Sequence, residues 1–112
     1  MKKIDAIIAP SELDTLQEAL RKVGVNGMTV SEVKATDDGN GGKRFYRGSE
    51  YTVDFFPRIK IELLVADANT EVATAAIERS VHSGGTGGTL ILVSSIEDVV
   101  RIRTGERGVG AV

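Results

Sequence analysis

Residues 37–54 read DDGNGGKRFYRGSEYTVD and separate two runs with the alternation of β-strands, residues 27–34 and residues 55–65. Tight hairpins need only about two to five connecting residues, so this connection is much longer than a turn. Its first part is acidic and rich in glycine, and its second part carries aromatic residues and cations. We interpret the segment as an arm that docks on another molecule. The alternative is an ordinary disordered hairpin tip.

The sequence on both sides of this arm alternates between strand and helix periods. Apolar residues recur at every second position in residues 3–8 and 59–65, as in half-buried strands. They recur at helical spacing in residues 13–23 and 72–81, and a short apolar run follows at residues 90–93. This order predicts an α+β fold, a ferredoxin-like βαββαβ sandwich with a long loop between the second and third strands and a short C-terminal extension.

Length and composition limit the class of protein. A chain of 112 residues fits one domain over residues 1–112, and its net charge of −2 gives no general attraction to nucleic acid or anionic lipid. No apolar run approaches the roughly 18 residues of a membrane span, and no signal peptide is visible. The chain has no cysteine and one histidine, so no disulfide and no metal site are predicted. A cytoplasmic location is expected.

Two stretches are compatible with phosphate binding. Residues 83–89, SGGTGGT, form a glycine loop whose N–H groups could converge on an anion, although a flexible helix C-terminus is the simpler interpretation. The loop lacks the lysine and hydroxyl residue of a P-loop. Arg101 and Arg103 stand two apart in residues 100–103, whose alternation predicts a final strand with both guanidinium groups on one face. Such a pair suits a polyphosphate, and the alternative is a solvated edge strand.

One face of the predicted sheet is left without helices, because two helices cover only the other. This second face is either solvated or paired with other copies of the chain, and its amphipathic pattern favours a closed homo-oligomer. It combines apolar and polar residues, namely Ile7, Val33 and Leu64 with Lys3, Thr29, Lys60 and Glu62.

Several motifs resemble those of the PII signal-transduction proteins, small trimeric regulators of nitrogen metabolism. YRGSEY at residues 46–51 resembles the nucleotidylation signature in the family's long T-loop. YTVDFFPRIKIE at residues 51–62 and RIRTGERG at residues 101–108 are similar to further family segments, as are residues 2–8 and 23–34. The similarity runs without gaps along nearly the whole chain. It implies a homotrimer whose clefts between subunits each bind an adenine nucleotide, ATP or ADP, beneath the base of the long loop.

The resemblance also implies roles for particular residues. The residues that match the family's nucleotide site, with the arginines on the phosphates, are Ile7, Thr29, Glu62, Gly87, Gly88, Thr89, Arg101 and Arg103. Arg58 takes the place of a lysine that pairs with 2-oxoglutarate, and Gly39 that of a glutamine that helps to hold magnesium. Tyr51 matches a tyrosine that is uridylylated or adenylylated in some members. Docking on target proteins is expected through Tyr46, Arg47, Gly48 and Tyr51.

The chain departs from the family's pattern at the phosphate end of this site. Leu90 replaces a phosphate-binding lysine, and Gly88 replaces an aspartate. Asp38 and Gly39 replace an arginine and the magnesium-binding glutamine. A site that loses two cations and gains a carboxylate should bind Mg-ATP less tightly. We expect no required cofactor, poor magnesium binding, a preference for ADP or AMP, and a weak or absent response to 2-oxoglutarate.

The leading interpretation is a signalling adaptor and not an enzyme. Its ligand would order or release the arm at residues 37–54, which would dock on a target transporter, enzyme or regulator. The alternative is a PII-like regulator of a transporter or of carbon or metal status, which senses ADP or AMP and no longer responds to 2-oxoglutarate. An acylphosphatase-like hydrolase would need a nucleophile with its base, and no such pair is visible. An RNA-recognition module would need aromatic residues where the sheet has Lys60, Glu62 and Leu64.

Overall fold

The computed structural model describes residues 1–36, 43–46, 49–52, 55–81 and 90–112. The strands of the described chain are β1 (Lys2–Ile8), β2 (Thr29–Ala35), β3 (Lys43–Tyr46), β4 (Ser49–Thr52), β5 (Phe56–Val65) and β6 (Leu90–Ser95). The α-helices are α1 (Leu13–Lys22) and α2 (Thr70–Ser80). Single turns of 3-10 helix are η1 (Pro10–Glu12), η2 (Asp67–Asn69) and η3 (Gly108–Ala111).

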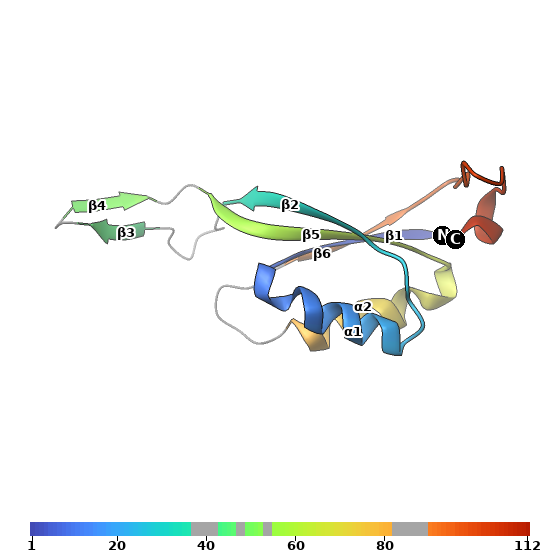
Figure 1. The fold of residues 1–112 in the computed structure, drawn as a ribbon, viewed down its shortest axis with the longest axis horizontal. Coiled ribbons are helices and arrows are strands. Elements are labelled where there is room, and N and C mark those ends of the chain that lie inside the picture. The colour runs from blue at the N-terminus through green and yellow to red at the C-terminus, as the bar shows by residue number, and fades with distance from the viewer. Residues whose placement is uncertain (37–42, 47–48, 53–54, 82–89) are drawn as a thin grey trace.

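The main sheet has the strand order β2-β5-β1-β6, and every neighbouring pair is antiparallel. Both α-helices lie on one face of this sheet, and no α-helix of the described residues covers the other face (Figure 1). The first and last strands of each strand–helix–strand unit are separated by another strand, as in split βαβ units. The predicted ferredoxin-like α+β fold is therefore confirmed.

The core lies between the helices and the covered face of the sheet. Ile61 and Leu63 of β5 point toward the helices and are 0% and 1% exposed, which fits the period of two in that strand. Leu16 and Leu20 stand four residues apart on α1 and meet them from the opposite layer. The remaining members of the buried cluster are Ile4, Ala6, Ile8, Ile59, Val65, Ala73, Ala76 and Ile77. Burial of these side chains is the main stabilising contribution to the fold.

The long connection between β2 and β5 contains a β-hairpin that the sequence did not predict. Strands β3 and β4 pair with each other in an antiparallel register from Lys43↔Thr52 to Tyr46↔Ser49. They lie beyond the end of the main sheet and far from the chain termini (Figure 1). This hairpin extends the molecule to 59 Å along its longest axis, against 25 and 20 Å along the others. The expected arm thus has secondary structure of its own over these residues.

The prediction of a final strand at residues 100–103 is wrong. Val100 makes one isolated bridge with Arg107, and the chain turns immediately after it. The turn closes where the Gly105 N–H donates to the Arg101 carbonyl, with an N···O distance of 2.8 Å. Gly105 has φ +76°, a left-handed conformation that favours glycine. Arg101 and Arg103 are therefore held by a turn, and no strand aligns their side chains.

Candidate functional site

A groove of about 490 Å³ opens at the end of the main sheet where the two termini lie. Its walls come from the start of β2, the second half of β5, the start of β1 and the C-terminal segment. The lining residues are Lys3, Gly27, Met28, Thr29, Glu62, Leu63, Leu64, Arg101, Ala111 and Val112. Thr29, Glu62 and Arg101 of the predicted nucleotide site are thus brought together from distant parts of the sequence.

Strand register explains why Thr29 and Glu62 share the groove. They are direct partners in the β2–β5 ladder, so their side chains lie on the same face, the one without helices. Asp5 of β1 is the partner of Glu62 on its other side. The uncovered face therefore presents a polar centre to any ligand in the groove.

Opposite charges compensate one another at this polar centre. The Glu62 carboxylate lies 3.4 Å from Lys3 Nζ and 3.7 Å from Lys60 Nζ, and Lys3 Nζ lies 3.7 Å from Asp5. The side chains of Lys3, Lys60 and Glu62 are each 33% exposed, so these pairs contribute little to stability. Asp5 Oδ1 is buried and has no hydrogen-bond partner among the described residues. The cluster can accept and donate hydrogen bonds without a large net charge.

Besides Lys3, which is paired with Asp5 and Glu62, the groove combines an apolar wall with a cation from the C-terminal segment. Leu64 of β5 and the C-terminal Val112 supply the exposed apolar surface, which suits an aromatic base. Arg101 supplies the cation, and its Nη2–H donates to the Ala111 carbonyl with an N···O distance of 2.8 Å. An aromatic ring with an anionic tail is the kind of ligand that such a surface can bind.

An ion pair fixes the segment that carries Arg101. Arg107 Nη1 lies 2.8 Å from Asp98 Oδ2, and the Val99 N–H donates to Asp98 Oδ1. The hydrogen bond from Arg107, followed by that from the Val99 backbone, lowers the pKa of the Asp98 carboxyl below its ordinary value. The Gly108 N–H donates to the Val99 carbonyl and closes the same loop.

Ile7, Leu90 and Arg58 lie away from the groove, toward the end of the sheet from which the arm leaves. In the sheet register Ile7 is paired with Leu90 of β6 and with Lys60 of β5. Arg58 stands near the start of β5, with its guanidinium 5.4 Å from the ring centroid of Phe56. The sequence-predicted nucleotide residues are thus divided between two ends of one sheet. Arg103 lies outside the groove lining.

Other predicted site residues lie outside the described residues, namely Gly39, Arg47, Gly48, Gly87, Gly88 and Thr89. Tyr46 ends β3, and Tyr51 of β4 is the register partner of Arg44. Their backbones place both tyrosines on the projecting hairpin. The docking and modification roles of these residues remain predictions.

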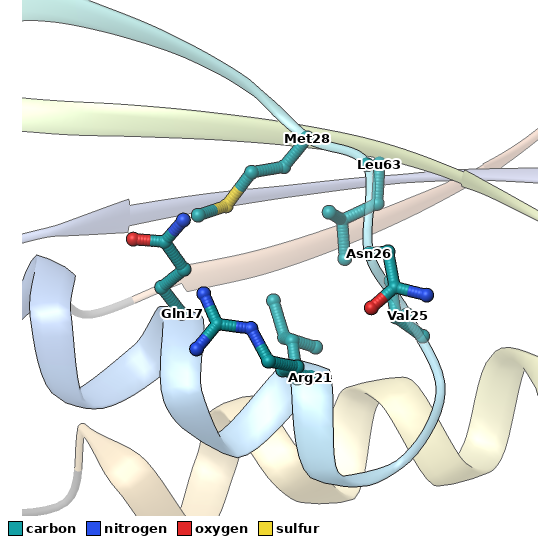
Figure 2. A pocket seen from close by; sticks show the side chains of 8 residues that line it. Gln17, Arg21, Val25, Asn26, Met28 and Leu63 are labelled. Carbon is teal, nitrogen blue, oxygen red and sulfur yellow. The ribbon is translucent and has the colours of Figure 1, made fainter.

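Sequence reasoning missed the roles of Lys3, Ala111 and Val112 in the groove. Lys3 could have been found from the strand period, because it pairs with Leu64 on the uncovered face. The C-terminal residues gave no such signal, since their position depends on the turns at residues 101–108. A second, much smaller cavity of about 20 Å³ shares Gly27, Met28 and Leu63 with the groove. Gln17 and Arg21 line it from α1, and Asn26 lines it from the connection to β2 (Figure 2).

The described ranges lack two further features, a membrane-spanning helix and a cluster of metal ligands. None of the helices there is long and apolar enough to cross a membrane. The same ranges contain no group of three or more His, Cys, Asp or Glu residues that could hold a metal ion.

The fold and the groove together define a class of protein. It is a ferredoxin-like α+β protein with a groove, large enough for a small ligand, at one end of its uncovered sheet face. The family model described as "Nitrogen regulatory protein P-II" matches residues 1–106. The chain belongs to this family, and it is a PII signal-transduction regulator of nitrogen metabolism. PII proteins are regulatory signal transducers and not enzymes as a family.

Known PII proteins are similar over the full chain. Proteins named nitrogen regulatory protein P-II from Rhizobium meliloti and Mesorhizobium japonicum are 47% and 49% identical over 112 residues, which is 100% of both chains in each comparison. The crystal structure of Arabidopsis thaliana PII bound to citrate superposes with a TM-score of 0.80 at 30% identity. That comparison covers 99% of this chain and 91% of the other.

Proposed function

We propose that this PII protein is a homotrimeric sensor of adenine nucleotides with a preference for ADP or AMP and a weakened response to 2-oxoglutarate. The observation that best supports a nucleotide site shared between subunits is the division of the residues that match the family's nucleotide site between two ends of the sheet. Thr29, Glu62 and Arg101 line a groove at one end. Ile7 and Leu90 lie toward the other, where the arm begins.

A second copy of the chain completes the site in this proposal. The groove of one subunit meets the Ile7 end of its neighbour, so that the nucleotide lies beneath the base of the neighbour's arm. PII proteins are homotrimers as a family, and a closed ring satisfies this contact for every subunit. The exposed apolar residues on the uncovered face, Leu64, Leu90 and Leu92, are 44%, 55% and 52% exposed in the single chain. Association would remove this apolar surface from water.

The altered phosphate end supports the change in nucleotide preference. Leu90 begins β6 and is paired with Ile7, so an exposed apolar side chain stands where the family has a cation. Loss of one charge-assisted phosphate contact costs about 1.5–3 kcal/mol, or tens-fold in affinity. Asp38 and Gly39 remove a further cation and a magnesium ligand from the proposed site. The γ-phosphate and its magnesium would lose most from these changes.

The hairpin β3–β4 is proposed as the surface that docks on target proteins. It projects beyond the main sheet, where a partner can reach it (Figure 1). Arg47 and Gly48 stand between the two strands in the sequence, and Tyr46 and Tyr51 belong to the strands. We assign these residues to target contact and Tyr51 to covalent modification. We further propose that residues 1–112 act as one domain in the cytoplasm without catalytic activity.

Calorimetric titration of the purified oligomer tests the nucleotide assignment. ATP, ADP and AMP are each titrated with and without magnesium and 2-oxoglutarate. We expect ADP or AMP to bind more tightly than Mg-ATP, with no strong synergy from 2-oxoglutarate. Leu90→Lys is the matched variant, and it should improve ATP binding tens-fold with a smaller effect on AMP. Tight magnesium-dependent synergy between ATP and 2-oxoglutarate in the unaltered chain would contradict the proposal.

Affinity capture with the intact oligomer as bait tests the docking surface. Arg47→Ala should abolish capture of the target protein while the oligomer and its nucleotide affinity remain unchanged. Arg79→Ala is the control, because it removes an arginine of helix α2 and leaves the hairpin unaltered. Equal capture by the Arg47→Ala variant and the unaltered chain would reject the assignment.

A further inference from the structure

We propose that the carbonyl of Ala111 is a positioning group, which holds the Arg101 guanidinium in the groove ready for the phosphate of a nucleotide. This inference rests on the proposed function, in which the groove takes an adenine nucleotide. Its basis is the hydrogen bond from Arg101 Nη2 to the Ala111 carbonyl, 2.8 Å long. Both residues line the groove beside Thr29 and Glu62.

The C-terminal segment is folded so that these residues, ten positions apart, meet. The Arg101 N–H donates to the Glu106 carbonyl at 2.9 Å, which fixes the backbone from which the guanidinium extends. Gly108 then has φ +70°, and this left-handed residue redirects the chain into η3. Ala111 at the end of η3 is 5% exposed, so packing holds its carbonyl in place.

The bond leaves Arg101 able to bind an anion. A guanidinium carries several N–H donors in a rigid fork, and the Ala111 carbonyl occupies one of them. Arg101 as a whole remains exposed in the single chain. The acceptor is a neutral carbonyl, so the positive charge of Arg101 is oriented without being neutralised. Arg107 in the same segment shows the contrast, because its guanidinium is paired with the Asp98 carboxylate at 2.8 Å.

Prior ordering of Arg101 should increase affinity for a phosphate. Immobilising a long side chain costs about 0.5–1.5 kcal/mol when it occurs on binding, which corresponds to about two- to tenfold in affinity. Because the hydrogen bond to the Ala111 carbonyl already orders the Arg101 side chain in the folded protein, this entropy is not lost again on binding. The benefit applies to the phosphate alone, because the base and ribose of a nucleotide do not require the guanidinium.

The test compares ADP with adenosine by calorimetry on the intact oligomer and on a variant that ends at Gly108. The truncation should weaken ADP about two- to tenfold more than adenosine, which lacks a phosphate and reports only the loss of the groove wall at Ala111 and Val112. A length-matched variant, with residues 109–112 replaced by Gly-Ser-Gly-Ser, avoids a new terminal carboxylate near Arg101. It keeps a carbonyl at position 111 but removes the packing that holds it in place, so it should give the same result. Retained adenosine binding also shows that each variant is folded.

Arg101→Gln completes a double-mutant cycle. In that background the truncation should weaken ADP no more than adenosine, because the guanidinium that Ala111 positions is absent. Equal weakening of ADP and adenosine by the truncation would overturn the inference and make the tail only a wall of the groove. Tighter ADP binding would overturn it by showing that the tail competes with the phosphate. Failure of the intact chain to bind either compound would instead remove the proposed function itself.

Discussion

Strand β5 and the C-terminal segment 98–112 both contribute to the groove, but different forces hold them in place. β5 is paired on both sides, with β1 and β2, and its inward side chains are buried under the helices. The C-terminal segment is fixed by glycine turns, an ion pair and single hydrogen bonds, and its Ile102 is 98% exposed. Hydrophobic burial therefore determines the shape of one wall, and local polar contacts determine the other. The two walls should respond differently to mutation, glycine replacement and acid.

The largest contrast is expected from removing one apolar side chain in each region. Ile61→Ala empties a site that is 0% exposed and should lower the free energy of unfolding by about 2–5 kcal/mol. Ile102→Ala changes a side chain that is 98% exposed and should change it by less than about 0.5 kcal/mol. Urea denaturation of the oligomer at one fixed protein concentration measures both. A large cost at Ile102 would mean that the segment is packed against another copy.

A smaller effect is expected at the glycine turn. Gly105→Ala places a Cβ at φ +76° and should destabilise the fold by about 1 kcal/mol, although nothing lies within 4 Å of that Cβ. Gly110→Ala is the matched control, because its φ is not left-handed and its Cβ would meet only Glu106 Oε2 at 3.9 Å. Thermal denaturation compares the two. If both replacements were equally tolerated, backbone conformation would not be what holds this turn.

The smallest effect is expected from acid at the Asp98–Arg107 pair. The pKa of Asp98 is lowered in the folded chain, so its stabilising contribution is complete above the ordinary aspartate pKa of about 4. That contribution is lost as pH falls through the lowered folded pKa. Asp98→Asn should therefore lower the melting temperature slightly at pH 7 and have less effect at pH 3.

Glu78→Gln on α2 is the control for loss of one carboxylate elsewhere. Melting curves over pH 3–7 of the three proteins give the comparison. A deficit of the Asp98→Asn variant that stays constant across this range would show that the ion pair does not contribute. The effect should also shrink in high salt, because both side chains are largely exposed.

The same difference explains how far the sequence could predict the structure. The alternation in residues 59–65 correctly indicated a strand, since every second side chain there has a core to enter. The alternation Val100-Arg101-Ile102-Arg103 looked similar, but no buried layer stands opposite Ile102. Without that layer, the left-handed conformation of Gly105 ends the extended chain in a turn. Alternation of apolar and polar residues therefore predicts a strand only where the apolar side chains are buried against a second layer.

The candidate site was predictable in part. Thr29, Glu62 and Arg101 were identified from resemblance, and the groove brings them together. Lys3, Ala111 and Val112 line the same groove and were not identified, because tertiary turns and register place them there. The hairpin β3–β4 was also missed. Its centre is Arg47-Gly48, which is not one of the Asn-Gly or Asp-Gly pairs that mark tight hairpins.

The β2–β5 ladder has a mechanical consequence. It is continuous from Thr29↔Glu62 in the groove to Ala35↔Phe56 beside the arm, a span of about 20 Å at the usual rise per residue. Two strands that are hydrogen-bonded along this length form one continuous element. In a ring of copies, the arm at one end of the ladder would lie above one bound ligand. The groove at the other end of the same ladder would hold the next ligand around the ring. The ladder would then connect each pair of neighbouring ligand sites through a single hydrogen-bonded element.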